Sequence, residues 1–419
     1  MLAAGLVWSS RIAANLMSEA LTGPMLEIDL GALLANWRLA SAAFTGRAVT
    51  AVVKSDAYGL GLATVAEILA GAGCRGFWVV SLEEAMVVRA CAPTAEVYAL
   101  HGLSGHPAQA FAAAGVQPVI ATLDDLTALA ALAGQPARCA VQVDTGLNRL
   151  GLGEKELALA QERGLFERVS VSLWVSHLAR FDNLDQPSNA LQRQRLRDWT
   201  TGLPPAPLSL AASSASFATP DWHLDIGRVG SALYGVPTAR GQTPPLAPVA
   251  SLVGPILRVA NIPAGRHVGY RELFVTRRPS RIATVALGYA TGVPQIAGNR
   301  ARVSIAGRLA PVVGGVSMNL LSVDVTDLPE QEVTPGARVE FFGARLRVED
   351  VAAGLDLSPN ALLTQAGAAL PRHYRSTSSS QPDDLAETPT VVWSANSHRS
   401  FKKPDHVVAG GGAISSPPP

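Results

Sequence analysis

The stretch Ala51-Val-Val-Lys-Ser-Asp-Ala-Tyr-Gly-Leu60 says more about fold and function than any other part of this 419-residue chain. It continues an apolar run from Val49, and such a run predicts a buried strand. Lys54 ends that strand, where loss of hydration favours its neutral amine, which can form a Schiff base. Tyr58 follows with a hydroxyl that can bind an anion. The alternative is a lysine facing solvent above a tyrosine in the core.

Length and composition limit the class of protein. A chain of 419 residues predicts two or more domains, and 48% hydrophobic residues suffice for a large core. The net charge of +1 gives no overall attraction to nucleic acid or anionic membranes, and no apolar run approaches the roughly 20 residues of a membrane span. The three cysteines form an odd set without metal-site spacing, which favours a reducing cytoplasm and no metal site.

The two ends of the chain differ from the rest. Residues 1–24 begin with an apolar stretch that no basic residue precedes, so we expect a disordered extension rather than a cleaved signal peptide. Folded sequence begins at Met25, and translation starting at Met17 or Met25 is an alternative. Residues 376–419 are rich in Ser, Pro, Thr and Asp and predict a disordered tail.

Short apolar runs alternate with stretches rich in alanine and leucine after the first strand. Eight strands with helices between them predict a (β/α)8 barrel. A doubly wound open sheet is the alternative, but no G-x-G-x-x-G follows the first strand. The expected strands cover residues 49–53, 77–80, 96–100, 118–121, 139–143, 171–176, 208–211 and 225–228. The expected helices cover residues 61–72, 81–91, 106–114, 122–133, 154–163 and 187–200.

A second domain is expected after a proline-rich linker at 237–249. Short strand-like runs separated by Gly and Pro then continue to Tyr374 and predict a smaller all-β domain. The expected fold class is therefore α/β, a barrel at 25–245 followed by a β domain at 246–375. The expected strands of the β domain cover residues 252–260, 281–287, 301–305, 311–313, 320–325 and 338–342.

Polar side chains follow the expected barrel strands where they end. In a barrel of this type the C-terminal ends of the strands surround the active site. Each such residue taken alone is more often a surface or capping residue, but together they predict a site. These residues are Lys54, His101, Asp144, Arg149, His177, Ser213, Ser214 and Arg228.

The segment from Val53 to Gly61 resembles the pyridoxal-phosphate (PLP) attachment motif of the alanine racemase family, V-K-A-[ND]-A-Y-G-H-G. Ser55 and Leu60 depart from it at positions without chemistry. The resemblance, which extends from about Met25 to Tyr374, implies that Lys54 holds PLP and serves as one proton-transfer base. It also implies that Tyr58 binds the cofactor phosphate.

Further barrel segments resemble the family. Residues 143–151 resemble D-T-G-M-x-R-L-G, which implies that Arg149 binds near the substrate carboxylate, as suits a two-pronged donor. Gln142 stands where many members have a carbamylated lysine. His177 follows its strand as the family's histidine does, which implies that it contacts the cofactor. Residues 212–215 resemble A-N-S-A, which places Ser214 on the phosphate, with Ser213 in place of asparagine.

Residues 225–235 loosely match V-R-x-G-x-x-[LM]-Y-G. The match implies that Arg228 faces the pyridine nitrogen and that the amides of Gly230 and Ser231 help to bind the phosphate. Arginine does not release its proton in proteins, so it keeps the ring nitrogen unprotonated. The carbanion is then short-lived, which favours racemisation over transamination. Related PLP enzymes that decarboxylate place a glutamate at this position.

In the β domain, Val268-Gly-Tyr270 resembles the family's V-[GS]-Y-G segment. The resemblance implies that Tyr270 is the second base, supplied by the partner subunit of a homodimer, and that the Met318 amide binds the substrate carboxylate across the dimer. Further departures from the family pattern cluster here and bear on substrate preference, rate and dimer stability. They are Thr291 for Asp, Gly315 for Arg and Asn319 for Asp.

We therefore expect a cytoplasmic, homodimeric, PLP-dependent alanine racemase that supplies D-alanine for peptidoglycan. Lys54 and the partner's Tyr270 would act on opposite faces of the substrate Cα. Three alternatives remain: a racemase that prefers serine or another amino acid, a barrel PLP lyase, and a PLP-binding paralogue with impaired catalysis. A methyl-scale difference between substrates is worth only about 1–3 kcal/mol, so the sequence does not fix the choice of amino acid.

Overall fold

The structure is a computed structural model that describes residues 23–132, 136–239, 241 and 243–375. The expected tail at 376–419 lies outside the described residues, as does the expected extension at 1–24 apart from its last two residues. Within the part that the structure describes, none of the helices combines the length and apolar character that crossing a membrane requires.

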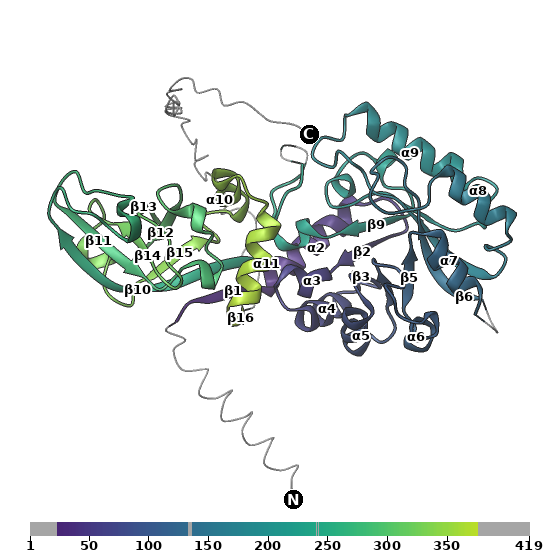
Figure 1. Ribbon diagram of the computed structural model, residues 1–419, viewed down its shortest axis with the longest axis horizontal. Coiled ribbons are helices and arrows are strands. Elements are labelled where there is room, and N and C mark those ends of the chain that lie inside the picture. The colour runs from purple at the N-terminus through teal and green to yellow at the C-terminus, as the bar shows by residue number, and fades with distance from the viewer. Residues whose placement is uncertain (1–22, 133–135, 240, 242, 376–419) are drawn as a thin grey trace, which may run out of the picture. The chain divides into compact units, whose positions relative to one another are not determined.

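The first sheet is a ring of eight parallel strands, in the order β8-β7-β6-β5-β4-β3-β2-β9 (Figure 1). Backbone hydrogen bonds join its two ends, from the Asp225 amide to Leu208 O (3.0 Å) and from the Arg228 amide to Ala211 O (2.9 Å). The (β/α)8 barrel is therefore confirmed. Its strands are β2 (Ala48–Val52), β3 (Gly76–Val79), β4 (Glu96–Ala99), β5 (Gln117–Ile120), β6 (Ala137–Gln142), β7 (Val169–Val175), β8 (Leu208–Ser209) and β9 (Ile226–Val229).

Helices connect the strands along the outside of the barrel (Figure 1). Ser81 and Thr122 begin two of them because their hydroxyls accept from amides three residues later, Glu84 N and Asp125 N. The six expected helices are present, and α2 and the short α3 are additional. The helices are α2 (Leu30–Ala43), α3 (Lys54–Tyr58), α4 (Leu62–Gly71), α5 (Leu82–Cys91), α6 (Ala108–Ala114), α7 (Leu123–Ala130), α8 (Glu154–Glu162) and α9 (Pro187–Thr200).

Large side chains fill the inside of the barrel. Trp78 stacks on Tyr98 with ring centroids 4.3 Å apart, and its indole N–H donates to Thr50 Oγ1 at 2.9 Å. Val119, Ala140, Leu173 and Val175 complete this cluster. The barrel therefore has a filled centre. In barrels of this type, active sites lie at the C-terminal ends of the strands.

The second sheet runs in the order β11-β14-β13-β12-β15-β10-β1-β16. Strand β10 is long enough to pair with β1 and β15 in its first half and with β11 in its second half, so six strands form a closed circuit. The strands are β1 (Met25–Asp29), β10 (Ala250–Ile262), β11 (Ser280–Val285), β12 (Arg302–Ile305), β13 (Arg308–Val313), β14 (Leu321–Asp324), β15 (Arg338–Phe342) and β16 (Arg372–Arg375).

Four elements of this second part were not among those expected, namely β1, α10, α11 and β16. Strand β1, at the start of the described chain, pairs antiparallel with β10 and parallel with β16. Helices α10 (Val348–Leu355) and α11 (Pro359–Ala369) precede β16. The α11 helix packs so closely on α3 that a Cβ added at Gly367 would lie 1.9 Å from Gly59 O. Helix α11 thereby reaches the segment that carries Lys54.

Candidate active site

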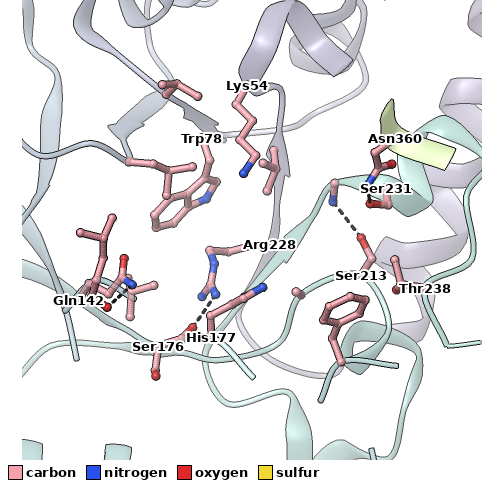
Figure 2. Close-up of a pocket in the computed structure, with 18 of the residues that line it drawn as sticks. Lys54, Trp78, Gln142, Ser176, His177, Ser213, Arg228, Ser231, Thr238 and Asn360 are labelled. Atoms are coloured by element: carbon pink, nitrogen blue, oxygen red, sulfur yellow. Dashed lines mark hydrogen bonds between the residues drawn. The ribbon is translucent and has the colours of Figure 1, made fainter. Parts of the chain in front are cut away.

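A cavity of about 490 Å3 opens at the C-terminal ends of the barrel strands. It brings together ten of the residues predicted from sequence, and no acidic side chain is among the described residues that line it. Figure 2 shows Trp78 and Gln142 toward one side, Ser231 and Asn360 toward the other, and Lys54 between them. The predicted residues in its lining are Lys54, Tyr58, His101, Arg149, His177, Ser213, Ser214, Arg228, Gly230 and Ser231.

Lys54 begins a turn of unusual backbone conformation. Ser55, Asp56, Ala57 and Tyr58 have φ values of 54°, 54°, 53° and 57°, all in the left-handed region. Each non-glycine residue in this region costs about 1–2 kcal/mol. The Glu84 carboxylate accepts from the Asp56 amide at 2.9 Å and from the Val80 amide at 2.8 Å, which helps to hold the turn against β3.

The Lys54 amine lies in the cavity. Burial, together with the nearby positive charge of Arg149, lowers the pKa of Lys54, and the Glu84 carboxylate opposes this shift in part. A lowered lysine pKa increases the fraction of neutral amine near neutral pH, the form that attacks a carbonyl or accepts a proton. The end of β2 therefore carries an amine that is able to act as a nucleophile or as a base.

Hydroxyl groups and amides gather at the side of the cavity that includes Ser231. Burial raises the pKa of Tyr58 to about 12, with a smaller opposing effect from a hydrogen bond with Ser231, so the phenol keeps its proton. The Asn360 side-chain amide donates to Ser231 Oγ at 3.0 Å. The Gly230 amide already donates to Ser213 Oγ at 3.0 Å, and a Cβ added at Gly230 would lie 2.7 Å from the Tyr58 hydroxyl.

Arg228 lies within β9 rather than beyond its end, where the sequence placed it. It is 6% exposed, and its guanidinium donates to Ser176 O at 2.6 Å and to the hydroxyl of Ser209. Its Cζ also lies 5.5 Å from the centroid of the Trp78 ring. Burial lowers the pKa of Arg228 to about 10, which leaves it positively charged at neutral pH.

His177 follows β7 and faces the three cations of the cavity. Burial lowers the pKa of His177 to about 3, and the positive charges of Arg228, Arg149 and Lys54 add to the shift. The imidazole is therefore neutral at physiological pH and can accept a hydrogen bond. Gln192 holds its backbone by donating to His177 O at 3.0 Å.

The loop that carries Arg149 is held by side chains of its own segment. Asp144 Oδ1 accepts from three successive amides, at 3.0, 2.9 and 3.0 Å. The Gln142 side-chain amide donates to Leu150 O at 2.7 Å. Gln142 thus fixes the backbone directly after Arg149, and Asp144 shapes the loop rather than lining the cavity.

Besides Asp144, two further predicted residues lie outside this cavity. Tyr270 is 74% exposed, in the 3-10 turn at Tyr270–Glu272, and Met318 is 55% exposed. Their loops are neighbours, because a Cβ added at Gly315 would lie 3.9 Å from Tyr270 O. Neither side chain lines the cavity of its own chain.

The family model of the alanine racemase N-terminal domain matches residues 28–238, and that of the C-terminal domain matches residues 249–374. The chain belongs to the alanine racemase family. The first match covers the barrel strands, and the second covers most of the second sheet. The two matches include the segments around Lys54 and Tyr270 whose sequences resemble the family.

Similar proteins carry the same family name. The chain is 36% identical to a protein of Mesorhizobium japonicum named alanine racemase, biosynthetic, over 91% of this chain and 96% of that protein. It is 39% identical to an alanine racemase of Rhodospirillum rubrum, over 84% and 95%. The crystal structure of alanine racemase from Bartonella henselae with covalently bound pyridoxal phosphate has a TM-score of 0.80 and 34% identity, and the match covers 84% of this chain and 99% of that one.

Several cavity residues of this alanine racemase family member were missed from sequence. Trp78 reads as an ordinary core residue of a strand, although its alternation with Phe77 places it inside the barrel. Thr238 lies in the proline-rich linker, and Asn360 lies on a helix that was not expected. Among the described residues, Thr238 Oγ1 and Asn360 Oδ1 are buried atoms without a hydrogen-bond partner. Both residues line the cavity.

Proposed function

We propose that this protein is a PLP-dependent alanine racemase that interconverts L-alanine and D-alanine with two bases, Lys54 and the partner subunit's Tyr270. The observation that carries the proposal is the cavity itself. A lysine of lowered pKa, a buried arginine that stays charged, and a group of hydroxyls occupy one site without an acidic side chain. The covalently bound pyridoxal phosphate of the Bartonella henselae structure supports the choice of cofactor.

The residues present fit PLP. The hydroxyls of Tyr58, Ser214 and Ser231 are donors suited to a phosphate, and the unpaired Thr238 Oγ1 is a further polar atom that a ligand in the cavity can satisfy. Gly230 leaves room beside Tyr58 that a Cβ would fill. Lys54 would hold the cofactor through its amine.

When bound, PLP withdraws electrons from the substrate Cα and so acidifies its C–H bond. Lys54 then moves a proton at one face of Cα. Arg149 supplies a two-pronged donor for the substrate carboxylate. Arg228 cannot pass its proton to the ring nitrogen that it would face, which favours prompt return of the proton to Cα over transamination.

The second base is assigned to a second copy of the chain. Racemisation needs a base on each face, because a single base returns the proton to the face it left. Tyr270 and Met318 are exposed, and they belong to an apolar surface of the β domain that suits a homodimer interface. Hydrogen bonds from the Tyr289 amide to Ser317 O and from the Asn299 side chain to Leu273 O connect its segments. The members of this apolar surface are Tyr270, Leu273, Tyr289, Ile296, Met318 and Leu320.

We place the enzyme in the cytoplasm, with D-alanine for peptidoglycan as its product. Cys74, Cys91 and Cys139 are free thiols in the structure, as suits a reducing compartment. We assign residues 25–245 to the barrel domain and residues 246–375 to the β domain.

The test is to incubate purified protein, saturated with PLP, with L-alanine, L-serine and L-lysine in separate reactions. Chiral chromatography then measures the D-isomer. We expect fastest conversion of L-alanine, as well as the reverse reaction from D-alanine. Faster conversion of serine or lysine would assign a different amino acid, and no conversion of any substrate by the PLP-loaded protein would leave only cofactor binding.

A further inference from the structure

The left-handed turn Ser55–Tyr58 joins the two residues that would hold opposite ends of one cofactor, Lys54 and Tyr58. None of its four residues is glycine, so the turn does not favour this conformation by itself. Its shape decides the distance and direction between the Lys54 amine and the Tyr58 hydroxyl. Contacts from outside the turn must therefore maintain it.

The strongest of these contacts come from β16. The Arg372 guanidinium pairs with the Asp56 carboxylate inside the turn, and its Nε donates to Gly59 O directly after the turn at 2.8 Å. Its Nη2 also donates to Gly367 O at 3.0 Å, which links the turn to α11. Tyr374, two residues further along β16, donates its hydroxyl to Leu60 O at 2.9 Å.

The fit of these groups is close on both sides. A Cβ added at Gly61 would lie 2.0 Å from the Tyr374 hydroxyl, and one added at Gly59 would lie 2.8 Å from Leu363 O. The other Asp56 oxygen, Oδ1, accepts from the Leu62 amide at 2.7 Å, so Asp56 is held from within the barrel and from β16 at once. The turn is thus fixed between two separate parts of the chain.

We propose that Arg372 is a positioning residue of the active site. By gripping Asp56 and Gly59 it keeps the turn left-handed, and so sets the Lys54 amine and the Tyr58 hydroxyl at the spacing that one PLP molecule requires. This inference rests on the proposed function, since it concerns the same cofactor. A fork-shaped guanidinium suits the task because it bonds a carboxylate and a backbone carbonyl together.

The proposal differs from a general contribution to stability. A residue that only stabilises the fold affects every ligand of the site alike. A residue that sets the spacing between Lys54 and Tyr58 matters most for a ligand that engages both. PLP carries an aldehyde for Lys54 and a phosphate for Tyr58, whereas pyridoxal carries the aldehyde without the phosphate. The dissociation constant of pyridoxal divided by that of PLP, called the ratio below, therefore reports the spacing.

The experiment compares Arg372→Leu with Arg375→Leu, a matched change on the same strand. Arg375 pairs with Glu27 and Asp29 and, within the part of the chain that the structure describes, forms no hydrogen bond or ion pair with the turn. Apoprotein is titrated with PLP and with pyridoxal, and the absorbance of the lysine-bound aldehyde gives both dissociation constants. In Arg372→Leu we expect PLP to bind at least about tenfold more weakly while pyridoxal changes little, since a lost hydrogen bond to a charged group is of this size. Arg375→Leu should leave the ratio unchanged.

Equal weakening of both ligands by Arg372→Leu, or the same result in both variants, would overturn the positioning role. Circular dichroism checks that each variant is folded. If Arg372→Leu does not fold, Asp56→Asn and Tyr374→Phe take its place in the same titrations, with the same expected fall in the ratio. Arg372→Lys, which keeps the positive charge but loses the fork-shaped guanidinium, should have a ratio between those of the unmodified protein and Arg372→Leu. If the unmodified protein forms no lysine-bound species with PLP, the proposed function fails.

Discussion

The Arg228 guanidinium donates to the carbonyl oxygen of Ser176 at 2.6 Å, directly before His177. This bond aims a buried cation into a cavity in which none of the described lining residues is acidic. Burial, and after it the charge of this cation, lowers the pKa of His177, so the site combines a fixed positive charge with a neutral imidazole. Anionic groups are the natural ligands of such a site.

Arg228→Glu should change the reaction rather than only slow it. A carboxylate would allow the cofactor ring nitrogen to take up a proton and become a stronger electron sink. We expect slower racemisation, an absorbance band at longer wavelength during turnover, and more transamination product. Arg228→Lys is the control, since it also loses contacts to Ser176 and Ser209 but keeps the charge. Normal racemisation by Arg228→Glu without the new band would show that Arg228 does not face the ring nitrogen.

Lys54→Ala should abolish covalent attachment of PLP. Purified protein should be yellow, and borohydride should fix the cofactor on a peptide that contains Lys54. Lys155→Ala is a matched control, because Lys155 is the other lysine of the described chain and is exposed on α8. An adduct that persists after borohydride treatment of Lys54→Ala would refute the assignment.

Tyr270→Phe should remove one of two proton transfers while PLP stays attached. Loss of a general acid–base group typically costs about 10²–10⁴-fold in rate. Abstraction from L-alanine should suffer most, and exchange of solvent deuterium into D-alanine should partly survive through Lys54. Mass spectrometry of the two isomers measures the difference.

Mixed dimers test where Tyr270 acts. If it is supplied to the partner's cavity, reassociated Lys54→Ala and Tyr270→Phe chains should form one intact site of two, while each parent homodimer is nearly inactive. No recovery in heterodimers that have been shown to form would mean that the tyrosine acts within its own chain or not at all.

His177 should make the protein less stable in acid. Its pKa falls from the ordinary 6.5 to about 3 in the folded state. Below about pH 6.5 the unfolded chain binds a proton that the native state does not, so the free energy of unfolding decreases by at most about 1.4 kcal/mol per pH unit until about pH 3. His177→Gln should remove this dependence. Urea denaturation between about pH 5 and pH 7 measures it, and equal slopes in both proteins would contradict it.

The barrel was predictable because each strand is a short apolar run bounded by helical sequence, and this pattern is local. The position of β1 was not, because Met25–Asp29 finds its partners in β10 and β16, more than 200 residues away. The α10 and α11 helices were not predicted, because the short strands separated by Gly and Pro before them led us to expect only β structure up to Tyr374.

The candidate site shows the same division. Lys54, Tyr58 and Arg228 belong to motifs with fixed spacing, and the structure brings them into one cavity. The left-handed turn gave no local signal, since Ser55, Asp56 and Ala57 are ordinary residues for a right-handed helix start. Asn360 enters the cavity only because α11 packs on α3, a contact that no sequence period encodes.

The pairing of β1 has a consequence for synthesis of the chain. The ribosome adds about 220 residues after Asp29 before β10 begins at Ala250. At about 5–20 residues per second, β1 stays without either partner for roughly 10–45 s. Its five buried residues offer an unpaired edge to other chains during that time. The second partner, β16, also carries Arg372 and Tyr374, so the turn after Lys54 receives its outer contacts only after β16 has left the ribosome.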